Sequence, residues 1–125
     1  MTGKPRAPVV SVKRVYESAA SDDGSRVLVD RLWPRGLASA TAGIDEWIPA
    51  IAPSTSLRRW FGHDPARFDE FRRRYLIELA DDEHAEPLQT LREAAERGRL
   101  TVLTATKDVS LSHASVLVGV ITNAP

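Results

Sequence analysis

Residues 26–36 read Arg-Val-Leu-Val-Asp-Arg-Leu-Trp-Pro-Arg-Gly, and this stretch decides the class of fold. The continuous apolar run Val27–Val29 is typical of a central strand that is buried on both faces. Pro34 and Gly36 end the strand, because proline donates no backbone hydrogen bond and glycine lets the chain reverse. Open α/β sheets hold their ligands at the carboxyl ends of such strands. The stretch therefore predicts a central strand and the position of a site.

Two further strands flank this one in the chain. Val9–Tyr16 begins with the alternation of a strand, and Leu100–Ala105 reads as a buried strand. The connection over residues 17–25 is short for a crossover helix, so its length favours a hairpin between the first two strands. The predicted helices are Ala38–Trp47, Thr55–Phe61 with Ser54 as its N-cap, a helix opened by Asp64 and Pro65, Glu86–Arg97 and Ser112–Ile121.

The order of these elements predicts an α/β fold, a single three-layer domain with a small, mostly parallel sheet and helices packed around it. Residues 1–8 are expected to form a flexible tail and residues 9–125 the domain. The predicted core under the helices includes the aromatic side chains of Trp33, Trp47, Trp60, Phe68, Phe71 and Tyr75.

Composition excludes several classes of protein. The 125 residues are 42% hydrophobic and 27% charged, which is typical of one soluble globular domain. The absence of cysteine excludes disulfides, thiolate metal sites and a cysteine nucleophile. No secretory leader is visible, and the longest apolar stretch, Ala114–Ile121, is too short to span a bilayer. We expect a cytoplasmic protein with no membrane contact.

Charge is balanced overall and unevenly distributed. Residues 31–75 hold eight arginines against five acids, and residues 78–108 hold eight acids against four bases. Arginine outnumbers lysine 14 to 3, which a GC-rich genome explains as well as a site does. The sharper interpretation is a pocket for phosphate or carboxylate, because a guanidinium binds such groups with two hydrogen bonds. Zero net charge argues against nucleic acid as a partner.

The candidate site combines three segments of the chain. Its predicted ligand-binding residues are Arg31, Trp33, Arg35, Arg58 and Lys107. If the strands are parallel, the cations converge on one rim, at least three of them around one cleft, with Asp30 within hydrogen-bond reach of one. Asp30 and His113 are the candidates for proton transfer, with Asp108 as a further acid at the rim. The alternative is a purely structural salt-bridge network that uses the same residues.

Cofactor motifs are missing from the sequence. It has no GxGxxG or Walker loop, no GxSxG elbow and no HExxH pair. His63-Asp64 resembles a metal-binding doublet, but Asp64 is already required as an N-cap. The prediction is therefore a site with neither metal nor cofactor.

Several blocks of the sequence together resemble one family. They include DRLWPRG (30–36), LRRWF (57–61), HDPARF (63–68) and TATKD (104–108). From Val12 to about Leu117 the chain resembles the YeaO-like branch of the family of domain of unknown function 488 (DUF488). The matching positions are Asp30, Arg31, Trp33, Pro34, Arg35, Gly36, Asp45, Trp47, Ser54, Leu57, Arg58, Tyr75, Lys107 and His113.

The resemblance implies a compact bacterial α/β protein and carries no activity with it. Longer relatives place a helix between the first two strands, which implies that those strands are parallel. The family pattern has an asparagine before the histidine of the last helix, and Ser112 stands there in this chain. A ligand contact made by that asparagine would be weakened here.

Three functional hypotheses follow. The first is a protein that binds a small phosphate- or carboxylate-bearing or nucleotide-like molecule, either as a binding protein or as an enzyme. The second is a non-catalytic interaction module whose Arg/Asp cluster is structural and whose arginine-rich helix face binds an acidic partner or a second copy of the chain. The third, which the charge balance disfavours, is nucleic-acid binding.

Overall fold

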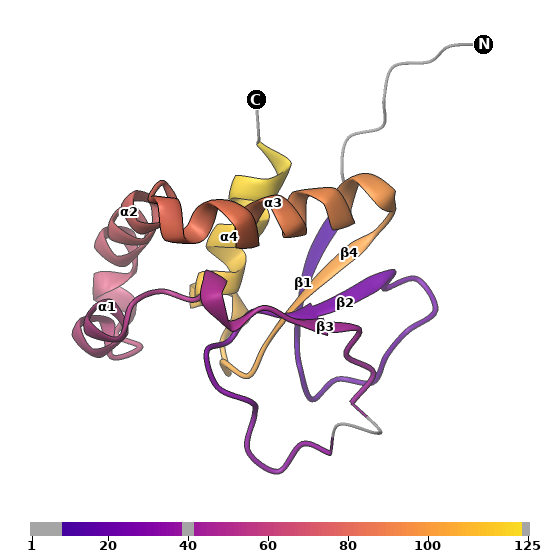
Figure 1. The fold of residues 1–125 in the computed structure, drawn as a ribbon. Coiled ribbons are helices and arrows are strands. Elements are labelled where there is room, and N and C mark those ends of the chain that lie inside the picture. The colour runs from indigo at the N-terminus through magenta and orange to yellow at the C-terminus, as the bar shows by residue number, and fades with distance from the viewer. Residues whose placement is uncertain (1–8, 39–41, 124–125) are drawn as a thin grey trace.

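The computed structural model describes residues 9–38 and 42–123, which form one small sheet and four α-helices. The strands are β1 (Val10–Arg14), β2 (Ser25–Leu28), β3 (Glu46–Trp47) and β4 (Leu100–Thr104). They lie in the order β1-β4-β2-β3, and every neighbouring pair is parallel (Figure 1). The predicted α/β class and small parallel sheet are confirmed.

The first two strands are parallel, whereas the short loop between them favours an antiparallel hairpin. β4 lies between β1 and β2 and is parallel to both, so the first two strands are parallel and do not touch along their edges. Residues 15–24 contain no helix and return the chain to the start of β2 as a loop. The hairpin expectation was wrong because it considered only strands that are consecutive in sequence.

The helices begin and end where local signals place them. They are α1 (Thr55–Phe61), α2 (Phe68–Leu79), α3 (Asp82–Arg97) and α4 (His113–Thr122), with short 3-10 segments η1 (Pro49–Ile51), η2 (Pro65–Arg67) and η3 (Val109–Leu111). Ser54 and Ser112 cap α1 and α4 as predicted, and Gly62 ends α1 in the left-handed conformation. α3 starts before the predicted Glu86, because the Asp81 side chain accepts the His84 N–H and caps it.

The predicted helix Ala38–Trp47 is not formed, and its residues 39–41 lie outside the described part of the chain. Glu46–Trp47 is instead strand β3, at the edge of the sheet beside β2. Asp45 N–H donates to the Arg26 carbonyl at 2.8 Å, and Arg26 N–H donates to Asp45 Oδ2 at 2.8 Å. Residues 46–47 therefore form a strand and not a helix because they pair with β2, which is distant in sequence.

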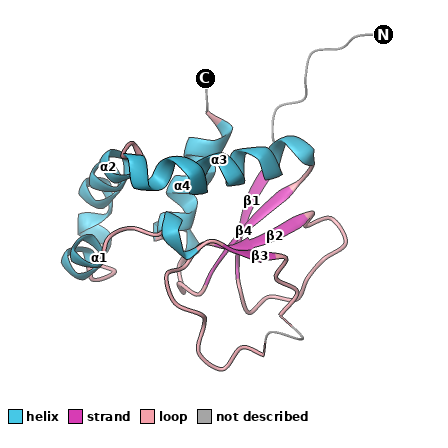
Figure 2. Cartoon of the chain, in the orientation of Figure 1, coloured by secondary structure: helices cyan, strands magenta, loops and turns pink. Residues whose placement is uncertain are grey.

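The two faces of the sheet are covered differently (Figure 2). Val27, Val29, Leu100 and Val102 face a large core to which all four helices contribute. On the other face, Val15, Leu28 and Leu103 form a smaller core with loop side chains, including Trp33 and Ile44. The helices thus lie on one face, and loops supply the layer on the other.

Aromatic residues hold the helical layer together. Phe71 stacks on Phe61 with ring centroids 4.2 Å apart, and Tyr75 lies buried beside Phe71 and donates to the Ile51 carbonyl at 2.6 Å. The expectation for the tryptophans was wrong in two cases. Trp33 packs against the smaller core on the loop face of the sheet. Trp47 is 40% exposed, because β3 is an edge strand, and its ring packs edge-on against Trp33.

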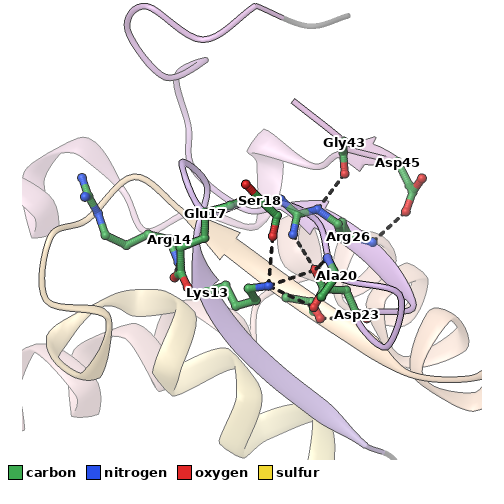
Figure 3. Close-up of polar contacts among 10 residues, drawn as sticks. Lys13, Arg14, Glu17, Ser18, Ala20, Asp23, Arg26, Gly43 and Asp45 are labelled. Atoms are coloured by element: carbon green, nitrogen blue, oxygen red, sulfur yellow. Dashed lines mark hydrogen bonds and ion pairs between the residues drawn. The ribbon is translucent and has the colours of Figure 1, made fainter. Parts of the chain in front are cut away.

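A buried ion pair organises the loop side of the sheet (Figure 3). Arg26 is only 3% exposed and donates through Nη1 to Asp23 Oδ2 at 2.6 Å. Its other guanidinium nitrogens donate to the backbone carbonyls of Gly43 and Glu17, at 2.7 and 3.1 Å. Lys13 on β1 also reaches the Asp23 carboxylate, at 3.1 Å. One cluster therefore joins β1, β2 and both loops that flank them.

Phe71→Ala tests the assignment of the helical core. Removing this fully buried ring should lower the free energy of unfolding by about 3–5 kcal/mol, measured by urea denaturation. Ile77→Ala, on the exposed side of the same helix, is the matched control and should change it by less than about 0.5 kcal/mol. Equal effects from the two substitutions would contradict the assigned helix face.

The Asp23 cluster should be visible in the pH dependence of stability. The N–H of Ala20, followed by Arg26 and Lys13, lowers the pKa of the Asp23 carboxyl from 3.8 to about 2. The stabilisation that the charged Asp23 carboxylate adds to the folded state is therefore complete above its ordinary pKa, and it is lost as the pH falls from about 4 towards 2. Urea denaturation of the wild type and of Asp23→Asn across that range should show a smaller acid-induced loss in the variant. Parallel curves would contradict this role for Asp23.

Candidate functional site

A pocket of about 640 Å³ opens where the carboxyl ends of β2 and β4 meet the first residues of α4. We call it the strand-end pocket and define it by Asp30, Arg35, Arg58, Arg59, Phe61 and His113 among its lining residues. The pocket thus lies at the edge of the sheet that the sequence indicates, and its volume is in the usual range for a small-molecule site.

Asp30 is held by the end of β4. Its Oδ1 accepts a hydrogen bond from Thr104 Oγ1 and its Oδ2 accepts one from the Ala105 N–H, both at 2.8 Å. The expectation that an arginine or lysine would bind this carboxylate was wrong, since neutral donors of the neighbouring strand occupy that position. These bonds fix Asp30 in the pocket wall and join the ends of β2 and β4.

His113 is the first residue of α4 and lies beside Asp30. Its Nε2 donates to the Val29 carbonyl at 3.0 Å and lies 3.5 Å from Asp30 Oδ1. Burial lowers the pKa of His113, and the positive charge of Arg58 adds to this, while Asp30 acts in the opposite direction. The lowered pKa favours the neutral ring at pH 7. Because the proton then lies on Nε2, Nδ1 is an acceptor, and no described residue donates a hydrogen bond to it.

Three arginines line the pocket. Arg35 comes from the loop after β2, and Arg58 and Arg59 come from α1. Arg58 donates to the Pro53 carbonyl and to Thr55 Oγ1, at 3.3 and 3.1 Å, which leaves most of its N–H groups available. Within residues 9–38 and 42–123, none of the three forms an ion pair.

Apolar side chains form the remaining walls. Phe61 and Phe71 line the pocket from the helical layer, and Trp33 and Leu111 line it from the loops. Trp33 is positioned by the hydrogen bond from its Nε1 to the Leu37 carbonyl, at 2.9 Å. The site combines apolar walls with a few polar groups, as small-molecule sites usually do.

The structure does not bring all the predicted cations together. Of the four, Arg35 and Arg58 line the strand-end pocket, so the expectation of at least three around one cleft was wrong. Arg31 lines a separate depression with Glu83 and His84, because the chain bends directly after Asp30. Lys107 lines a neighbouring depression beyond Thr106. Asp108, also at that end, caps η3 and is not bound to Lys107 among the described ion pairs.

Two further residues of the pocket, Arg59 and His63, were not expected in it, and His63 was considered only as part of a metal-binding doublet. Arg59 follows Arg58 on α1, and nothing in the sequence distinguishes it from the other surface arginines. His63 has a positive φ of 57°, a conformation that is uncommon outside glycine and is often found at functional sites. The Gly62-His63-Asp64 turn that places it could be read from the sequence, but not its proximity to β4.

The sequence matches one protein family over most of its length. A family model described as the inactive DUF488-N3 subclade matches residues 9–124. The chain belongs to the DUF488 family. Among DUF488 relatives, the uncharacterized protein Rv3073c of Mycobacterium tuberculosis is 47% identical over 108 residues, which cover 86% of this chain and 89% of the relative.

The uncharacterized protein YeaO of Escherichia coli is 42% identical over 108 residues, covering 86% of this DUF488 chain and 92% of its own. No solved structure matches the chain. Among the described residues, no helix is long and apolar enough to cross a membrane, and no three potential metal ligands form a group.

The ionisation of His113 can be tested by NMR against His84 as an internal comparison. The pKa of His113 should lie below the ordinary histidine value of 6.5. At pH 7, long-range ¹H–¹⁵N spectra should show the neutral tautomer that is protonated at Nε2 and unprotonated at Nδ1. Burial opposes ionisation of His84 too, but its bond to Asp81 raises its pKa above 6.5. A reversed order of the two pKa values would contradict the described site.

Proposed function

We propose that this protein binds a small molecule carrying a phosphate or carboxylate group in the strand-end pocket, and that it does so without chemical turnover. The observation that carries the proposal is the set of three guanidinium groups around one pocket, none of which has an acidic partner among the described residues. Grouped cations repel one another, so an arrangement of this kind is stabilised by an anion that binds between them.

The geometry around the arginines favours an anion further. Guanidinium groups bind phosphate and carboxylate with paired hydrogen bonds. Asp30 is the one acid that lines the pocket within the described residues, so the local charge is positive although the chain is neutral overall.

Two observations favour binding over catalysis. The family model that matches the chain is described as an inactive subclade. In addition, both candidates for proton transfer already have structural partners. Both Asp30 oxygens accept hydrogen bonds from β4 and the residue after it, and the His113 Nε2–H is committed to the Val29 carbonyl. Holding these groups in one state suits recognition better than proton transfer, which needs a group that can exchange its proton.

The alternative, an interaction module that uses the arginine-rich helix, has less support. Arg73 and Arg74 of α2 both bind Glu70, at 2.6 and 2.8 Å, so much of their charge is neutralised within the helix. Arg67 and Arg74 also lie against the Trp60 ring, at 5.4 and 4.2 Å from its centre. Most arginines of this face thus have partners, whereas those of the pocket have no acidic partner among the described residues.

Thermal unfolding with a panel of inorganic phosphate, nucleotides and sugar phosphates tests the proposal. A ligand at 100 times its Kd stabilises the folded protein by about 2.7 kcal/mol. Arg35→Gln should abolish this stabilisation and leave the melting temperature without ligand unchanged, because its side chain is exposed and forms no ion pair among the described residues. Arg58→Gln should also abolish ligand stabilisation.

Arg72→Gln, on the exposed surface of α2 and outside the pocket, is the matched control and should retain the full ligand response. A lack of stabilisation by every compound in the panel would contradict the proposal. So would an Arg35→Gln variant that melts several degrees lower without ligand, since that result indicates a structural role.

A further inference from the structure

Asp30 is an unexpected residue in an anion-binding pocket. A simple anion bound among the three arginines would be repelled by this carboxylate, which lies at 17% exposure in the same wall. None of those arginines neutralises it, since its described partners are Thr104, the Ala105 N–H and the nearby His113. A carboxylate kept in such a place is accounted for if the ligand brings a hydrogen-bond donor to it.

His113 adds a second acceptor at the same position. Its side chain is 11% exposed, and its Nε2–H is directed to the Val29 carbonyl. In the neutral ring Nδ1 can only accept, and no described residue donates a hydrogen bond to it. The strand-end pocket therefore has an inner end that accepts hydrogen bonds, at Asp30 and His113, and an outer end with exposed cations, at Arg35 and Arg59.

The walls between these ends are apolar and partly aromatic. Trp33, Phe61 and Leu111 border the same cavity of about 640 Å³, which can hold a ring. We infer that the ligand is an aromatic or heterocyclic ring that carries an N–H donor on one side and a phosphate or carboxylate on the other. The donor faces Asp30 and His113, and the anionic group faces the arginines. This inference rests on the proposed function and specifies the class of ligand.

Three probes of matched size test it by isothermal titration calorimetry: phenyl phosphate and its 3-amino and 4-amino derivatives. In the wild type, at least one amino derivative should bind about tenfold more tightly than phenyl phosphate, as expected for a hydrogen bond to a charged acceptor. Asp30→Asn and His113→Leu should each reduce this preference to about twofold or less. Neither variant should bind phenyl phosphate more weakly than the wild type, and Asp30→Asn should bind it more tightly because a repelling charge is removed.

Arg58→Gln is the control and should weaken binding of all three probes by the same factor, because it acts on the phosphate that they share. The preference is the affinity for an amino derivative divided by the affinity for phenyl phosphate in the same variant, so a general loss of affinity does not change it. If Asp30→Asn does not fold, as judged by circular dichroism, His113→Leu decides.

The remaining outcomes separate the two proposals. Equal affinities of the wild type for the three probes, with Arg58→Gln still weakening them, would overturn the donor-bearing ring and leave anion binding intact. Binding of inorganic phosphate alone would have the same meaning. An amino preference that persists in both Asp30→Asn and His113→Leu would overturn the assigned orientation. Binding of none of these compounds would overturn both proposals.

Discussion

A buried pair of charges, Arg26 with Asp23, holds together the side of the sheet that faces away from the helices. The removal of two charges from water is costly, and it is tolerated here because the guanidinium also donates to two backbone carbonyls and the carboxylate also accepts from Lys13 and Ala20. These carbonyls belong to the loop after β1 and to the segment before β3. The cluster thus holds the connections between parallel strands against the sheet, which is the role of a packed crossover helix in larger α/β proteins.

This arrangement determines the position of the pocket. With β4 between β1 and β2, the carboxyl ends of β2 and β4 are neighbours, and Asp30 can reach Thr104 and Ala105 across them. The same juxtaposition brings the first turn of α4 to the end of β2, where His113 meets the Val29 carbonyl. α1 approaches from the helical side and contributes the two adjacent arginines. The pocket is therefore a product of the strand order.

The polar groups of the pocket differ in burial. Its two hydrogen-bond acceptors, Asp30 and His113, are mostly buried and held by neighbouring groups, whereas Arg35 and Arg59 are exposed. Preorganised acceptors lose little conformational entropy when they bind a matching donor, whereas exposed arginine side chains can adjust to the position of an anion. Such a division is well suited to a ligand with two chemically different ends, and it accounts for an acid inside a positive pocket.

The sequence by itself determined those features that depend on neighbouring residues. The buried run Val27–Val29, the caps Ser54 and Ser112, the left-handed Gly62 and the apolar face of α2 all follow from local rules of backbone geometry and periodicity. The DRLWPRG segment and His113 were likewise correctly placed at the strand ends. Their roles in binding or in proton transfer are not decided by that placement.

Only the tertiary structure decided the features that depend on pairing across the chain. β1 and β2 are parallel because β4 lies between them and is parallel to both. Glu46–Trp47 forms a strand because it pairs with β2. Arg31 lies outside the strand-end pocket, which Arg59 lines, because of the direction of the chain after Asp30. For the strands, backbone hydrogen bonds with partners that are distant in sequence outweighed the local preference. The spacing of residues cannot show which partner that is.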